Sequence, residues 1–141
     1  MNLNAWNEIV SGLSNPDVPT CVEAASRLHA GAVPEDIPQL LSLLESDDFF
    51  VREAAAWPLA ELAGPAALPQ LLKAYQRGFD EGHDNDGFSA ALLEIPALFG
   101  PEATRAIAAF AETAEGKMKG HALWLLEFCD RTGGANRGGG E

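Results

Sequence analysis

The stretch Pro38-Gln39-Leu40-Leu41 recurs as Pro69-Gln70-Leu71-Leu72, 31 residues further along the chain. At the same offset, residues 20–44 align on residues 51–75 without a gap. A fixed period of this length indicates a stack of supersecondary units, each too small to bury its own apolar face. The sequence therefore predicts a repeat protein.

The repeat continues towards the C-terminus with one insertion. A shift of 36 residues places Gly64-Pro65 on Gly100-Pro101, so that five extra residues precede Gly87. A further shift of 31 residues sets residues 91–93 on residues 122–124. The two shifts extend the array to four units.

Each unit has the pattern of two helices. Val51, Ala55, Leu59 and Leu62 recur at three to four residues, and Gly64-Pro65 ends one helix and opens the next. Strand patterns with period two are absent. We expect eight helices in four antiparallel pairs, at about 3–13, 17–30, 35–45, 49–63, 65–77, 87–99, 101–113 and 117–130. A single domain over 1–131 and a disordered glycine-rich tail over 132–141 are expected to make up the chain.

A set of residues in the second unit carries a family resemblance: Leu40-Leu41, Leu43-Leu44, Asp47-Asp48, Val51-Arg52, Ala55-Ala56, Leu59 and Leu62. The set resembles the HEAT repeat, in particular the short form of about thirty residues found in phycobilin lyases and many bacterial proteins. The resemblance covers roughly residues 17–130 and implies an all-α, right-handed α-solenoid. The spacing of Asp48 and Arg52 is similar to the family's ladder, in which a loop carboxylate meets the following arginine.

The composition is strongly acidic. Twenty-one Asp and Glu residues stand against nine Lys and Arg residues, which gives a formal net charge of −12. This charge repels nucleic acids and anionic membranes and attracts basic proteins. In the alternative, the excess of acidic residues only keeps the protein in solution. No apolar run is long enough for a membrane span, and the N-terminus fits neither a secretory signal nor a transit peptide, so a cytoplasmic location is expected.

The densest acidic segment spans residues 78–87 and includes the insertion. Its polar side chains are Asp80, Glu81, His83, Asp84 and Asp86. An EF-hand calcium loop is excluded, because its first and twelfth positions would be Gly82 and Leu93. Three interpretations stay open: an irregular cation site, a solvated loop that caps the next helix, and a recognition loop for a basic partner.

Six residues are candidates for a partner-binding strip on the concave face. The resemblance assigns Val51, Ala55 and Leu59 to the core and leaves Glu53, Trp57 and Glu61 on the open side of their helix. The later units add Leu93, Trp124 and Phe128. Aromatic anchors beside charged residues are typical of protein interfaces. In the alternative, Trp57 packs on a neighbouring helix, and Trp124 and Phe128 fill the core of the last unit.

Catalytic signatures are lacking in the sequence. His29, His83 and His121 lie in different units, and no metal-binding His or Cys spacing occurs, so we expect no cofactor and no enzyme activity. The preferred function is a protein–protein interaction module with an acidic concave face, acting as an inhibitor or immunity protein for a basic protein such as a toxin; the resemblance supports this by analogy with bacterial immunity proteins. The alternatives are a phycobilin lyase or isomerase-like subunit and an adaptor in a larger complex.

Overall fold

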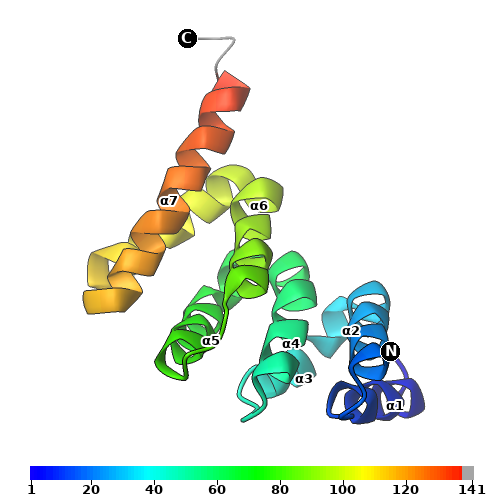
Figure 1. Ribbon diagram of the computed structural model, residues 1–141. Helices are drawn as coiled ribbons and strands as arrows, with labels where there is room; N and C mark the ends of the chain where they lie inside the picture. The colour runs from blue at the N-terminus through cyan, green and yellow to red at the C-terminus, as the bar shows by residue number, and fades with distance from the viewer. Residues whose placement is uncertain (138–141) are drawn as a thin grey trace.

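Helices account for all the regular secondary structure in the described part of the chain (Figure 1). The computed structural model describes the backbone of residues 1–137 and the side chains of residues 1–129. The α-helices are α1 (Leu3–Leu13), α2 (Val18–Gly31), α3 (Ile37–Leu43), α4 (Phe49–Leu62), α5 (Leu68–Asp80), α6 (Asp86–Thr113) and α7 (Gly116–Arg137). Short 3₁₀ turns at Pro34–Asp36 and Gly64–Ala67 lead into α3 and α5. The predicted all-α fold is confirmed.

The break predicted between the helices at 87–99 and 101–113 lies inside α6. Gly100 has non-helical dihedral angles (φ 50°, ψ −125°), and the chain is helical on either side of it. The chain bends sharply there, and the second half of α6 lies beside α7 (Figure 1). Helix α7 continues to Arg137, past residue 132 where the tail was expected to begin, and residues 138–141 lie outside the described residues.

The two Gly-Pro pairs that the repeat superposes both begin with a glycine at positive φ. Gly64 has φ 55° and Gly100 has φ 50°, in the left-handed region that favours glycine. Each is followed by a proline, whose missing N–H is tolerated at the start of a helical segment. The 36-residue shift read from the sequence therefore joins two positions at which the chain turns through a glycine at positive φ.

Several helices begin at a side-chain cap. Asn2 accepts a hydrogen bond from the N–H of Ala5 at 2.8 Å, Asp17 from Thr20 at 3.1 Å and Asp48 from Phe50 at 2.9 Å. These oxygens satisfy N–H groups that have no partner within the first turn of a helix. Polar residues just before α1, α2 and α4 therefore fix where the three helices start.

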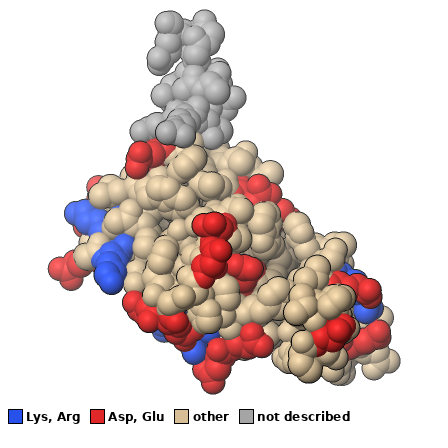
Figure 2. All heavy atoms as spheres, viewed as in Figure 1, with Lys and Arg blue, Asp and Glu red and all other residues tan. Residues whose placement is uncertain are grey.

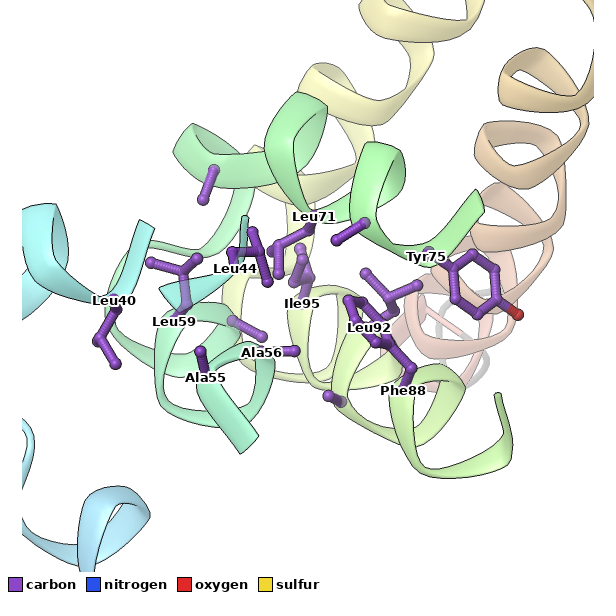
Figure 3. Packing of buried hydrophobic residues seen from close by; sticks show 14 of the residues in the cluster. Leu40, Leu44, Ala55, Ala56, Leu59, Leu71, Tyr75, Phe88, Leu92 and Ile95 are labelled. Atoms are coloured by element: carbon purple, nitrogen blue, oxygen red, sulfur yellow. The ribbon is translucent and has the colours of Figure 1, made fainter. Parts of the chain in front are cut away.

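The apolar core runs between successive helices. Leu40 of α3, Leu59 of α4, Leu71 of α5 and Ile95 of α6 are fully buried, and their side chains point towards one another in Figure 3. Burying a leucine or isoleucine side chain stabilises a fold by about 1.5–3 kcal/mol. No helix within residues 1–137 combines the length and the apolar character that crossing a membrane requires.

Candidate protein-binding face

The six residues predicted for the binding strip lie on three helices. Glu53, Trp57 and Glu61 come from α4, Leu93 comes from α6, and Trp124 and Phe128 come from α7. All six are half-buried. They fall into two groups, because Trp57 and Glu61 contact residues of α2 and α6, whereas Trp124 packs against α5.

Trp57 and Glu61 share a neighbour on α2. The His29 Nε2 atom lies 2.8 Å from Glu61 Oε1, and the His29 ring centroid lies 5.7 Å from that of Trp57. The imidazole therefore contacts both an indole ring and a carboxylate. The sequence did not single out His29 as a member of the strip, although it lies seven residues after Val22, which the repeat aligns on Glu53.

Glu94 of α6 completes this group. It lies close enough to Glu61 for the two carboxyl groups to affect each other's ionisation. Burial raises the pKa of Glu94 above its ordinary value, the carboxyl group of Glu61 raises it further, and the charge of His29 opposes the shift. The sequence placed its neighbour Leu93 on the strip and left Glu94 out. We call His29, Trp57, Glu61 and Glu94 the Trp57 cluster.

The Glu53 carboxylate lies at the start of α6. Its carboxylate accepts a hydrogen bond from the N–H of Phe88, and a Cβ atom on Gly87 would lie 2.8 Å from Glu53 Oε2. Burial raises the pKa of Glu53, the charge of Asp84 adds to the shift, and the Phe88 hydrogen bond opposes it. Asn85 precedes α6 but donates its side-chain amide to the Tyr75 carbonyl at 2.8 Å. A carboxylate from α4 thus lies at the first turn of α6.

Trp124 and Phe128 belong to an aromatic group between α5 and α7. The Trp124 ring is stacked on Tyr75 with centroids 6.0 Å apart, and it meets Phe128 edge-on at 5.5 Å. His121 packs edge-on against Tyr75 at 4.9 Å, and the Tyr75 hydroxyl lies 2.6 Å from Ser89 Oγ. Trp124 thus packs against α5, while Trp124 and Phe128 both stay half-buried.

Glu81 of the acidic segment is the centre of an ion-pair network. It accepts a hydrogen bond from Arg52 Nη2 at 2.5 Å and another from Arg77 Nε at 2.7 Å, and Arg77 also reaches Asp47 at 2.9 Å. The hydrogen bonds from Arg52 and Arg77 lower the pKa of Glu81 to about 2. The ladder expected between Asp48 and Arg52 is therefore replaced: Asp48 caps α4, and Arg52 bonds to Glu81 and to the Ser46 carbonyl.

Asp80, His83, Asp84 and Asp86 of the acidic segment are exposed. Asp80 accepts a hydrogen bond from Gln76 Nε2 at 2.8 Å, and Asp84 accepts one from the N–H of Asp86, the first residue of α6, at 2.9 Å. His83 is stacked on Phe49 with centroids 4.3 Å apart. Within the described residues, no group of three or more His, Cys, Asp or Glu side chains could hold a metal ion. The segment is thus attached to the fold through Glu81 and His83 while its aspartates face solvent.

Comparison with known proteins places this fold in a family. The family profile described as HEAT repeats matches residues 7–82, which is more than half of the chain. The chain belongs to the HEAT-repeat family. This HEAT-repeat protein is 44% identical over 55 residues to phycocyanobilin lyase subunit alpha of Synechococcus elongatus. The match covers 39% of this chain and 20% of the relative, so the chain spans about a fifth of that protein. No solved structure matches the chain.

Proposed function

We propose that this HEAT-repeat protein is a non-catalytic binding module that holds a basic protein partner against the Trp57 cluster. HEAT repeats act in protein–protein interaction, which supports the general function. The basic character of the partner is inferred from the net charge of −12. Acidic side chains outnumber basic ones on the face drawn in Figure 2, with an acidic group near the middle of the view.

The observation that carries this proposal is the chemical make-up of the Trp57 cluster. A half-buried indole and the Glu61 carboxylate both contact His29, and the side chains of the cluster come from α2, α4 and α6. Central aromatic anchors supply much of the energy of protein interfaces, and surrounding charges accelerate association. A module of this kind suits inhibition of a basic enzyme, so an inhibitor or immunity protein for a toxin is the specific role that we propose.

The proposal is tested by measuring affinity and stability on the same variants. The partner is first captured from lysate of the source cells with the tagged chain and identified. We then expect Trp57→Ala to weaken its binding by about 2 kcal/mol or more while the variant stays folded. Leu123→Ala is the control, because it removes an exposed apolar side chain from α7. A destabilised Trp57→Ala protein with normal affinity per folded molecule would contradict the proposal.

A lyase-type subunit is the second candidate function, and the partial match to phycocyanobilin lyase subunit alpha favours it. This function requires a bilin chromophore as ligand. Incubation of the purified chain with phycocyanobilin, followed by gel filtration, distinguishes the two functions. Co-elution of bilin absorbance with the protein would support the lyase-type subunit, and separate elution would support the binding module.

A further inference from the structure

A cavity of about 710 Å³ lies between α3, α5 and the start of α7, with α5 between the other two helices (Figure 1). Its volume falls within the range of about 300–1,000 Å³ that is typical of ligand sites. None of its lining residues belongs to the Trp57 cluster. We call this cavity the α5 groove; the lining residues include Leu41, Leu44, Lys73, Ala74, Asp80 and Met118.

Side-chain contacts hold the walls of the α5 groove together. Gln76 Oε1 lies 2.7 Å from His121 Nε2, which joins α5 to α7. Arg77 donates a hydrogen bond to the Ser46 carbonyl at 3.3 Å, just after α3, and pairs with Asp47 at 2.9 Å. The groove is therefore preformed, and a ligand that enters it does not first have to order these helices.

The floor of the groove is apolar. Leu44 of α3 and Ala74 of α5 are buried, whereas Leu41 of α3 and Met118 of α7 are half-buried and line the same cavity. Ligand sites commonly combine such a floor with a few polar groups at the edge, which fix the orientation of the ligand. The α5 groove is thus suited to an apolar group about the size of an amino-acid side chain.

The two ends of the groove carry opposite charges. Gln70 and Lys73 line it in the first half of α5, and Asp80 lines it at the end of α5, where Arg77 reaches the carbonyl of Glu45 at 3.5 Å. Lys73 and Glu45 have no ion-pair partner within the described residues. Asp80 accepts its hydrogen bond from the neutral amide of Gln76. The cation and the carboxylates are therefore left to interact with a ligand.

A short peptide with free ends matches this arrangement of charges. Lys73 and Asp80 are seven residues apart on one helix, which is about 10 Å at 1.5 Å per residue. An extended tripeptide also spans about 10 Å, and at neutral pH it carries a carboxylate at one end and an ammonium group at the other. A ligand with only one charge would satisfy one end of the groove and leave the other without a partner.

We infer that the α5 groove binds a short peptide, with the peptide carboxylate beside Lys73 and Gln70, its ammonium group beside Glu45 and Asp80, and an apolar side chain on the floor between them. This inference goes beyond the proposed function, because it uses other residues and requires no basic protein partner.

The site is tested on the full chain by NMR with methyl-labelled methionine. The chain has two methionines, so Met118 reports on the groove, Met1 is the internal control, and Met118→Leu assigns the signals. At about pH 6.5, we expect the peptide Ala-Leu-Ala to shift the Met118 signal saturably and to leave Met1 unchanged. Acetylation of its N-terminus or amidation of its C-terminus should each weaken binding about threefold to fivefold, because one partly exposed ion pair is lost. Equal shifts at both methionines, or equal affinities for the free and blocked peptides, would overturn the site.

Two lysine variants locate the peptide carboxylate. Lys73→Gln should remove the preference for the free over the amidated C-terminus and keep the preference for the free over the acetylated N-terminus. Lys119→Gln removes the same charge from an exposed position of α7 outside the groove lining, and it should keep both preferences. Equal effects of the two variants would overturn the assigned orientation. A Met118 shift with phycocyanobilin and none with the peptides would assign the groove to a bilin and overturn the peptide site.

Discussion

Arg52 links the repeat array to the insertion through its contact with Glu81. Its side chain is completely buried, and it donates hydrogen bonds to the Ser46 carbonyl and to Glu81. Phe49 lies under the guanidinium at 5.6 Å. A buried charge is tolerated only when it is paired and hydrogen-bonded. The buried Arg52 guanidinium therefore fixes the position of the Glu81 carboxylate. The sequence gave no sign of this long-range pair, and a recognition loop was one of the three interpretations that it left open for the segment containing Glu81.

We expect Arg52→Ala to destabilise the protein by about 3 kcal/mol, because it removes a large buried side chain together with its hydrogen bonds. Arg77→Ala is the comparison, since Arg77 binds the same Glu81 from a partly exposed position and should cost at most about 1 kcal/mol. Urea unfolding followed by circular dichroism gives both values. Equal losses in the two variants would show that the burial of Arg52 is unimportant.

Glu81 also predicts how stability depends on pH. Its pKa in the folded protein is about 2, below the ordinary value of 4.5, so the ionised form is favoured by folding. This stabilisation is complete above the ordinary pKa and is lost as the pH falls from about 4.5 to about 2. Wild type should therefore melt above Glu81→Gln at pH 7, and the difference should shrink towards pH 2. Thermal melts across this range provide the measurement, and a difference independent of pH would contradict the assignment.

At the scale of the candidate site, helical periodicity identified part of the Trp57 cluster. Trp57 and Glu61 lie four residues apart on one helix, so the repeat register alone places them together. His29 and Glu94 come from other units, and their contact with Glu61 depends on how α2 and α6 pack against α4. Pairings of this kind arise from tertiary packing, to which a single sequence gives little access.

At the scale of the elements, the turn chemistry was predictable. The Gly-Pro pairs marked the ends of helices, and Gly100 separates two helical segments of α6 with its non-helical dihedral angles. The turn at Gly64 opens into a 3₁₀ segment instead. Space around the two glycines also differs, since a Cβ atom at Gly64 would lie 2.5 Å from the Phe99 ring, whereas one at Gly100 would meet nothing within 4 Å.

This difference gives a matched pair of substitutions. Gly100→Ala introduces only backbone strain and should cost about 1–3 kcal/mol, because φ 50° with ψ −125° is a conformation that residues with a Cβ atom rarely adopt. Gly64→Ala carries the same strain and also displaces the Phe99 ring, so it should cost clearly more. Chemical denaturation of the two variants ranks them. An equal loss of stability would mean that Phe99 moves away freely.

At the scale of the whole molecule, the helices follow one another across the structure from α1 to α7 (Figure 1). Helices α1 and α2 pack together at one end, and the second half of α6 packs with α7 at the other. The repeat period predicted this arrangement, because stacked units contact mainly their neighbours in the chain. Stability should therefore be distributed along the array.

Removal of either end tests this distribution. A chain that ends at Ala114 lacks α7, whose buried Ala122 and Leu125 are part of the core that includes Ile107 of α6. We expect the second half of α6 to fray, the urea m-value to fall, and the amide signals of α2 to stay in place. A chain without α1 should show the reverse, with shifts around Ala24 and Leu28 of α2 and unchanged signals near Ile107. Amide NMR spectra of the two shortened chains provide the measurement. Complete unfolding in both cases would mean that the core is one indivisible unit and not a stack of repeats.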